Sequence, residues 1–360
     1  MRLIIPIFIM SRGCPHRCIF CNERITVGDQ PERLTEEAFG QAIRSYLSWT
    51  RRVPDRIQIA FYGGNFTGMP RSEQVEHLAF ADRFIREGSV HDVRISTRPD
   101  WIDDEILDLL EEYHVRTVEI GAQSMIDEVL NCADRGHSSA DVTRAVSLLR
   151  KRRMEVGLHF MAGLPGDSPS RFAGTVERAV ALRPDTVRIH PTLVLAGTAL
   201  AERFLCGEYF PLTTAEAIEA GKYAVQMFEE AGISVIRVGL QTTPRMEVPG
   251  AVLAGPHHPA FRSLVEESIF LDMASALLRA DSAAGATVTF SVCPQDVSSL
   301  RGHRNRNISI LQERFGLSAI AVSVDPDRKR GNLAVTARGR TIQVRRWGVP
   351  EACDATGIVQ

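Results

Sequence analysis

The sequence predicts an α/β fold built around a parallel sheet, and three observations support this. Strand-like and helix-like stretches alternate along most of the chain, with roughly 20 to 35 residues from one strand to the next. The 360 residues, 44% of them hydrophobic, suffice for one large core and a second, smaller domain. In the expected strands polar and apolar residues alternate, so that one face of the sheet is polar. About six or seven strand-helix units predict a partial or full parallel (β/α) barrel.

The expected elements follow in a regular order. The first strand is the apolar run from Leu3 to Met10. The first long helix begins at the N-cap residue Thr35, and a capping box of Thr213 and Glu216 begins the last helix of the series. Further strands are expected at 56–62, 93–97, 115–120, 156–161, 186–191 and 233–238, with helices at 72–86, 103–112, within 125–152, 170–182 and 213–230.

One face of the expected strands collects polar side chains. These are Gln58, Tyr62, Ser96, Arg98, Glu119, Gln123, His159, Arg188 and His190. The intervening residues are apolar, as in Ile57, Ile59 and Phe61. A closed barrel filled only by its own side chains has an interior of Val, Ile and Leu. The pattern therefore predicts a barrel with a polar lumen that can hold a ligand.

Cys14, Cys18 and Cys21 lie on the loop that leaves the first strand. No secretion signal precedes them, so thiols this close together are better explained as metal ligands than as disulfide partners. A structural zinc site needs four ligands, and His16 is the candidate for the fourth. A 4Fe-4S cluster held by three thiolates would leave one iron open for a small molecule. Both sites are compatible with the loop alone.

The spacing Cys-x3-Cys-x2-Cys, with Phe20 before the third cysteine, resembles the signature of the radical S-adenosylmethionine (SAM) superfamily. In that family three cysteines hold a 4Fe-4S cluster whose open iron binds SAM. One electron, from a donor such as flavodoxin or ferredoxin, then cleaves SAM to a 5′-deoxyadenosyl radical. The resemblance implies this cofactor pair, with Cys14, Cys18 and Cys21 as the cluster ligands.

Gly63, Gly64 and Asn65 follow the second strand and resemble the glycine motif that holds the methionine amino group of SAM. A backbone without Cβ atoms can approach a ligand closely. The common motif has Glu after the glycines, so Asn65 departs from it.

Later motifs occur in the order seen in the branch that includes the Elongator catalytic subunit and oxygen-independent coproporphyrinogen III oxidase. They contain Arg98, Gln123, Arg135 and His159. The resemblance implies that Gln123 and Arg135 contact the ribose and the carboxylate of SAM, and the planar fork of arginine suits a carboxylate. His159 stands where the oxidases carry an acidic residue. No stretch after Gln241 resembles the acetyltransferase domain of the Elongator subunit.

The charge of the chain is uneven. The net charge is −2, but Ser298 to Trp347 contains eleven Lys and Arg against three Asp and Glu, giving +8 against −10 for the remainder. Such a basic block is expected for a polyanion partner. Within it, Gly302 and the Asn-Ile-x-x-Leu segment that follows resemble a KH module, in which a glycine loop between helices clamps a nucleotide backbone. The RNA-binding candidates there are Arg301, His303, Arg304 and Arg306.

Three domains are predicted: a radical SAM (β/α) barrel over residues 1–243, a loop and connecting helix over 244–285, and a small basic α/β domain over 286–360. No run approaches the roughly 20 apolar residues of a membrane span, and cluster thiols need a reducing compartment, so a cytoplasmic enzyme is expected. It would abstract hydrogen from an unidentified substrate, with RNA or tRNA as a candidate. The alternatives are a radical SAM enzyme acting on a small molecule, like the tetrapyrrole oxidases, and a non-catalytic RNA-binding protein with a structural metal site.

Overall fold

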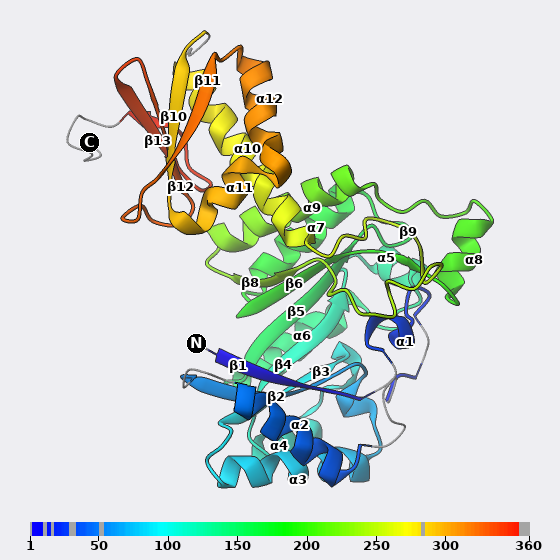
Figure 1. Cartoon of the computed structure of the whole chain (residues 1–360). Helices are drawn as coiled ribbons and strands as arrows, with labels where there is room; N and C mark the ends of the chain where they lie inside the picture. Colours follow the sequence, from blue (N-terminus) through cyan, green and yellow to red (C-terminus); the bar gives the residue numbers. More distant parts are fainter. Residues whose placement is uncertain are drawn as a thin grey trace. The chain divides into compact units, whose positions relative to one another are not determined.

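The computed structural model describes residues 2–9, 13–15, 18–28, 34–49, 54–281 and 285–352 (Figure 1). The chain divides into two compact units, residues 1–259 and 260–360. Residues 244–259 fold with the first unit, whereas the helix expected as a connection belongs to the second. In the described part of the chain, no helix is both long and apolar enough to cross a membrane.

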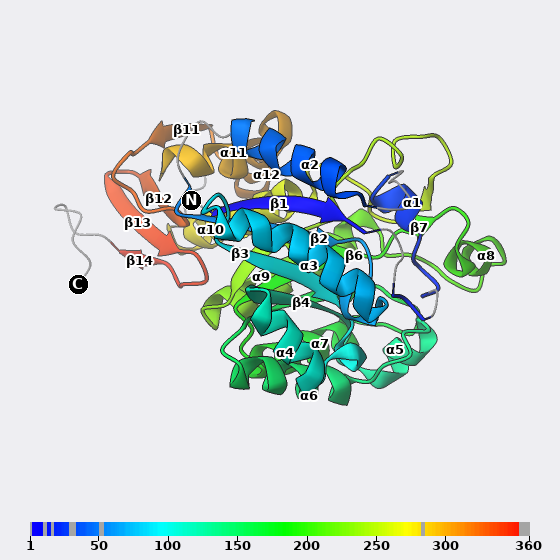
Figure 2. The same cartoon turned by 90° about the horizontal axis from the view of Figure 1, so that it is seen from below.

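The first unit is built on seven parallel strands in the order β1-β2-β3-β4-β5-β6-β8. They are β1 (Arg2–Phe8), β2 (Arg56–Tyr62), β3 (Asp92–Thr97), β4 (Val115–Gln123), β5 (Glu155–Ala162), β6 (Thr186–Pro191) and β8 (Ser234–Val238). The sheet curls into a half-barrel (Figure 2), with β1 and β8 as its edge strands. The prediction of a partial parallel (β/α) barrel is confirmed.

Helices cover the outer face of this sheet. The longer ones are α2 (Glu36–Trp49), α3 (Arg71–Arg86), α4 (Asp104–Glu112), α6 (Ser139–Lys151), α7 (Pro169–Ala181) and α9 (Thr214–Glu230), and the shorter ones are α1 (Glu23–Thr26), α5 (Asp127–Cys132) and α8 (Ala199–Leu205). Under them the apolar strand face is fully buried, as at Ile59 and Phe61. The predicted capping box of Thr213 and Glu216 is present. A two-stranded ribbon of β7 (Val194–Leu195) and β9 (Val252–Ala254) completes the unit.

The helices expected within 125–152 are present as α5 and α6. Residues 133–138 separate them. Asp134 and Gly136 have φ angles of 50° and 65° there, which a continuous right-handed helix excludes. A capping box of Ser138 and Asp141 then begins α6. This break places Ala133 and Arg135, both buried, against the cysteine loop.

The second unit has a five-stranded sheet in the order β11-β10-β12-β13-β14. Its elements are α10 (Phe261–Asp281), β10 (Thr287–Val292), α11 (Val297–Arg301), α12 (Arg306–Phe315), β11 (Ala319–Val324), β12 (Asn332–Ala337), β13 (Arg340–Arg345) and β14 (Glu351–Ala352). Strands β10 and β11 are parallel, and the other pairs are antiparallel. Helices α11 and α12 are separated by a turn that begins at Gly302, whose φ is 69°.

Candidate functional site

The cysteine loop is anchored by the residues between its cysteines. Ile19 is buried against Val194, Leu200 and Tyr209. The Ile19 N–H donates to the Ala133 carbonyl at 3.3 Å, and the Leu200 N–H donates to the Ile19 carbonyl at 2.8 Å. The aromatic residue of the motif, Phe20, packs against two apolar clusters. One contains Ile19 and the other contains Leu164. Contacts far along the chain therefore hold this loop at the C-terminal edge of the sheet.

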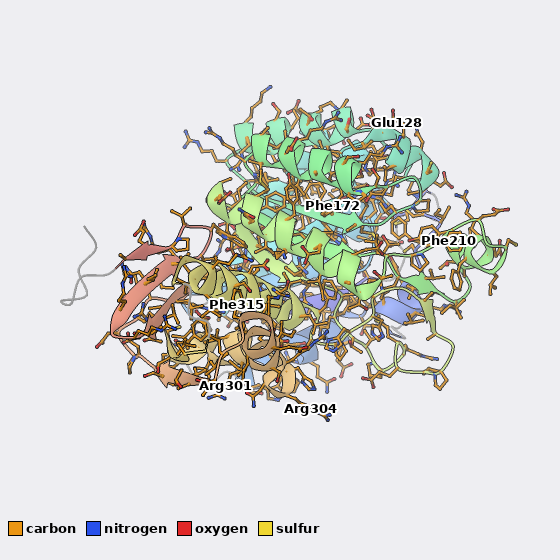
Figure 3. The ribbon with its side chains drawn as sticks, turned by 90° about the horizontal axis from the view of Figure 1, so that it is seen from above. Glu128, Phe172, Phe210, Arg301, Arg304 and Phe315 are labelled. Carbon is orange, nitrogen blue, oxygen red and sulfur yellow. The ribbon has the colours of Figure 1, made fainter. Side chains whose placement is uncertain are left out.

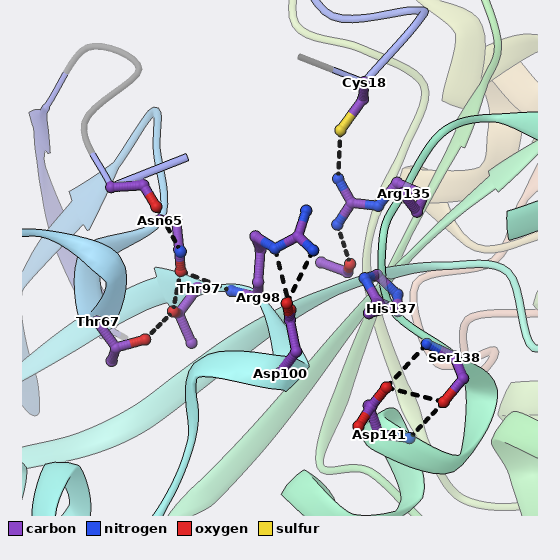
Figure 4. Close-up of polar contacts among 12 residues, drawn as sticks. Cys18, Asn65, Thr67, Thr97, Arg98, Asp100, Arg135, His137, Ser138 and Asp141 are labelled. Atoms are coloured by element: carbon purple, nitrogen blue, oxygen red, sulfur yellow. Dashed lines mark hydrogen bonds and ion pairs between the residues drawn. The ribbon is translucent and has the colours of Figure 1, made fainter. Parts of the chain in front are cut away.

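A second anchor ties the start of the loop to the segment after β2. The amide of Asn65 donates to the Gly13 carbonyl at 2.7 Å, and its oxygen accepts from Thr97 Oγ1 at 2.6 Å and from the Arg98 N–H at 3.1 Å (Figure 4). Gly13 has φ +75°, and a Cβ there would lie 2.2 Å from the Asn65 carbonyl oxygen and 2.6 Å from Gly68 C. Only glycine fits this approach. Asn65 therefore uses its side chain to position the cysteine loop.

Arg135 connects the loop to the barrel. Its Nη1 donates to Cys18 Sγ at 2.9 Å, and its Nη2 donates to the Gly121 carbonyl at 2.7 Å (Figure 4). A Cβ at Gly121 would lie 3.2 Å from Gln123 Nε2 and 3.4 Å from Arg135 Nη2, so glycine leaves room for both side chains. The guanidinium therefore lies against the sulfur of one of the three predicted cluster ligands.

Several buried polar atoms beside Arg135 have no partner among the described residues. They are Arg135 Nε, Gln123 Oε1 and His137 Nδ1. Gln123 ends β4 with φ +66°, after a shift in register with β5. Buried polar groups without a partner are uncommon in proteins and are found at binding sites. These atoms, with donors and acceptors mixed, suit a polar ligand held beside the cysteine loop.

Arg98 and the Nε2 atom of His137 have protein partners. Arg98 forms a two-pronged ion pair with Asp100, with Nε to Oδ1 at 3.0 Å and Nη2 to Oδ2 at 2.9 Å. His137 Nε2 donates to the Ala122 carbonyl at 3.2 Å. Burial, and then the charges of Arg135 and Arg98, lower the pKa of His137 to about 4, so it is neutral at pH 7.

The three predicted ligands sit on one loop, with Cys18 buried and Cys14 and Cys21 exposed. Within the described residues, no group of three or more His, Cys, Asp or Glu side chains is arranged to hold a metal ion. The donor set still fits an iron-sulfur cluster, because thiols are its usual ligands and Arg135 already donates to one sulfur. His16, the fourth ligand in the zinc alternative, lies outside the described residues. Gly63 has φ +83°, and the atoms nearest to an added Cβ belong to Phe8, Ile9 and Val27, which flank the loop; the adjacent Gly64 is half-buried.

The lumen is crossed by a charged layer centred on Glu119. Arg188, from β6, donates to Glu119 Oε1 at 2.9 Å and to the Tyr62 hydroxyl at 2.8 Å, and its guanidinium lies 5.1 Å from the Tyr62 ring centroid. The Tyr62 hydroxyl donates to Glu119 at 3.2 Å, and Arg94, 2% exposed, also donates to this carboxylate. The predicted polar lumen is therefore present at Tyr62, Glu119 and Arg188. Arg94 was missing from the sequence prediction, although it shares the alternation of Ser96 and Arg98.

His159 and His190 form a pair on the same side of the lumen. His159 Nε2 and His190 Nδ1 are 2.9 Å apart. Burial, and then the charges of Arg188 and Arg135, lower the pKa of His159 to about 3. The pKa of His190 is lowered as well, mainly by burial and next by His159. Both rings are neutral at pH 7, and His159, predicted to contact SAM, has His190 as its protein partner.

The predicted RNA-binding residues lie together on the second unit. Arg301 ends α11, Arg306 begins α12, and His303 and Arg304 are exposed on the turn between them (Figure 3). Arg304 and Asn305 have φ angles of 51° and 62°, and the buried Asn307 fixes the turn by donating to the Glu267 and Ser299 carbonyls at 2.9 and 3.1 Å. The predicted glycine loop between two helices is therefore present.

Comparisons with known proteins agree with this fold. Residues 8–179 match the Radical SAM superfamily, and residues 184–270 match the Radical_SAM C-terminal domain. Protein YhcC of Escherichia coli K12 is 31% identical over 227 residues, which cover 57% of this chain and 71% of that protein. The tRNA uridine(34) acetyltransferase of Methanocaldococcus infernus is 28% identical over 260 residues, 61% of this chain and 48% of that one. The chain thus spans about half the length of this relative.

Among solved structures, the archaeal Methanocaldococcus infernus Elp3 with an N-terminal deletion matches with a TM-score of 0.59 and 23% identity, covering 74% of this chain and 62% of that one. This likeness agrees with the half-barrel fold. The superfamily match runs from the end of β1 through nearly all of α7, and so includes both the cysteine loop and the segment of Arg135. Superfamily membership implies a 4Fe-4S cluster and SAM, and it excludes the non-catalytic alternative. The chain belongs to the radical S-adenosylmethionine superfamily and is a SAM-dependent enzyme.

Proposed function

We propose that Cys14, Cys18 and Cys21 hold a 4Fe-4S cluster, and that SAM binds beside it against Gly63, Gly64, Gln123 and Arg135. The observation that carries this proposal is the contact between Arg135 Nη1 and Cys18 Sγ at 2.9 Å, next to buried polar atoms that lack partners. When bound, the cluster and SAM supply a 5′-deoxyadenosyl radical that abstracts hydrogen from the substrate. A one-electron donor such as flavodoxin or ferredoxin is required.

The protein's own residues have distinct roles in this proposal. Gln123 Oε1 and Arg135 Nε offer one acceptor and one donor to SAM, and the planar fork of Arg135 suits its carboxylate. Gly63 lets the backbone approach the ligand. Asn65 and Arg98 position other parts of the site and do not contact SAM themselves, because their side chains are bonded to Gly13 and Asp100. His159 faces the lumen, where the substrate would lie.

We propose RNA as the substrate class. The relative from Methanocaldococcus infernus is named for tRNA uridine(34), and the basic segment Ser298 to Trp347 carries +8. His303, Arg304 and Arg306 are exposed on one turn, and no ion pair holds them among the described residues. Exposed arginines on a shaped turn suit a phosphate backbone.

The cluster is tested by anaerobic reconstitution of the full chain with iron and sulfide, followed by dithionite and SAM. We expect 5′-deoxyadenosine from the wild type and from Cys206→Ser, which removes an exposed free thiol outside the Cys-x3-Cys-x2-Cys motif. Cys18→Ser should bind little iron and form no product. Equal iron content and product from Cys18→Ser would contradict the assignment.

RNA binding is tested by its salt dependence with a tRNA transcript. Each phosphate contact to a single strand should contribute about −0.7 to the slope of log K against log salt. Arg304→Glu should weaken binding and flatten this slope more than Arg340→Glu, which makes the same charge change on β13. Binding that is insensitive to salt, or equal effects of the two variants, would instead favour a small-molecule substrate.

A further inference from the structure

Two arginines stand side by side at one edge of the half-barrel. Arg188 on β6 and Arg237 on the edge strand β8 are register partners, and His190 lies two residues beyond Arg188 on the same strand face. Arg188 reaches across the lumen to Tyr62 and Glu119. Arg237 has electrostatic interactions with the same two residues and with His190, so its charge is also on the lumen side.

These charges are not balanced. Glu119 is the carboxylate that Arg94 and Arg188 share. Arg237, by contrast, forms no ion pair or side-chain hydrogen bond with any described residue, although it is half-buried. Burial and the charge of Arg188 lower the pKa of Arg237 from its ordinary value. Placing a second arginine beside a first without a carboxylate costs stability, unless an anion binds there.

Hydrogen-bond donors beside Arg237 lack partners as well. Arg188 Nε and His190 Nε2 are buried and have no partner within the described parts of the chain. In the tautomer in which His159 Nε2 donates to His190 Nδ1, the hydrogen of His190 is on Nε2, the atom without a partner. The guanidinium of Arg237, the Nε–H of Arg188 and the Nε2–H of His190 are then all hydrogen-bond donors, and only an acceptor can satisfy them.

We propose that Arg188, His190 and Arg237 form a binding site for an oxyanion, either a phosphate or a carboxylate. The site offers N–H donors from two neighbouring strands and one positive charge that the protein leaves unpaired, which suits an anion with several oxygens. The residues proposed for SAM come from other segments: the loop after β2, the end of β4 and the segment after α5. We therefore assign the anion to a group of the substrate. This assignment rests on the proposed function, whereas the existence of the anion site does not depend on it.

The site is tested on the full chain, under anaerobic conditions and at constant ionic strength, by calorimetric titration with inorganic phosphate and, separately, with acetate. Saturable binding of phosphate identifies a phosphate site, and saturable binding of acetate identifies a carboxylate site. Arg237→Gln should weaken that binding roughly tenfold or more, equivalent to about 1.4 kcal/mol. Arg116→Gln, an exposed arginine on β4, is the matched control and should bind as the wild type does.

Three results would overturn the proposal: no saturable binding of either anion, equal binding by Arg237→Gln, or competition by SAM, which would mean that the site holds the SAM carboxylate. Arg237→Lys provides a second variant that keeps the charge, and it should retain part of the affinity. No reductant or SAM is needed for the anion titrations. Failure to form 5′-deoxyadenosine would therefore leave this test intact, and loss of anion binding would leave the cluster assignment intact.

Discussion

Gly13→Ala is the sharpest test of how the fold holds the cysteine loop. The substitution adds a single methyl group where φ is +75° and where a Cβ would lie 2.2 Å from the Asn65 carbonyl oxygen, 2.6 Å from Gly68 C and 2.6 Å from Met69 N. All three contacts are backbone atoms, so no side chain can rotate away. Gly207 has the same φ of +75° but no atom within 4 Å of an added Cβ. Gly207→Ala therefore isolates the cost of the backbone conformation.

The two variants differ by a predictable amount. A left-handed conformation costs a non-glycine residue about 1–2 kcal/mol, and the reduced freedom of the unfolded chain returns about 0.4–1 kcal/mol. Gly207→Ala should therefore lose about 1 kcal/mol of unfolding free energy. Gly13→Ala must also move packed backbone, which adds about 1–3 kcal/mol. A total of about 3 kcal/mol is enough to displace the loop from its anchor on Asn65.

The assay is iron content per chain after anaerobic reconstitution, with thermal unfolding of the same samples. We expect Gly207→Ala to bind iron as the wild type does, with a slightly lower melting temperature. Gly13→Ala should bind clearly less iron and unfold at a lower temperature than Gly207→Ala. If Gly13→Ala and Gly207→Ala behaved alike in both measurements, the close approach of the loop to Asn65 would not be what positions the cysteines.

Two further predictions concern the lumen. Glu119→Gln removes the carboxylate shared by Arg94 and Arg188 and should lower the free energy of unfolding of the first unit by about 3–5 kcal/mol, measured with denaturant. The control Asp108→Asn breaks an ion pair at a 68% exposed side chain and should change this free energy by less than about 1 kcal/mol. Similar losses in the two variants would refute the argument. Since the folded pKa of His159 is about 3, below its ordinary 6.5, the unfolded chain binds more protons between these values, so stability should fall as pH drops below 6.5. His159 should contribute about 2 kcal/mol to the loss between pH 7 and 5, in addition to the contributions of His137 and His190, so His159→Gln should be less acid-sensitive; equal acid sensitivity of the variant would contradict this.

Local patterns in the sequence predict much of this fold. The alternation of polar and apolar residues places Tyr62, Glu119 and Arg188 on one strand face, and a side chain's face depends only on strand periodicity. The capping box of Thr213 and Glu216 marks a helix start, because both partners lie within one turn. Arg94 obeys the same alternation and could have been included.

Other features depend on contacts that no local pattern contains. The fit of Gly13 against Asn65 joins segments 52 positions apart, so neither residue alone predicts it. Gln123 adopts φ +66° although it is not glycine, and only the register shift between β4 and β5 explains that conformation. Arg237 looks like an ordinary strand arginine until its register with Arg188 is known. Sequence patterns therefore identify the elements and the cysteines, whereas the unpaired charge becomes visible only in the folded sheet.

The arginines around the lumen differ in the groups that neutralise their charges, and this difference shows where ligands could bind. Arg188 has Glu119 and Tyr62, and Arg98 has Asp100. Arg135 donates to a sulfur and to a carbonyl, and neither partner is a carboxylate. Arg237 has no such partner among the described residues. In the proposals made above, the cluster and SAM neutralise Arg135 and an anionic group of the substrate neutralises Arg237, so the two arginines would hold the two reactants at opposite ends of the lumen.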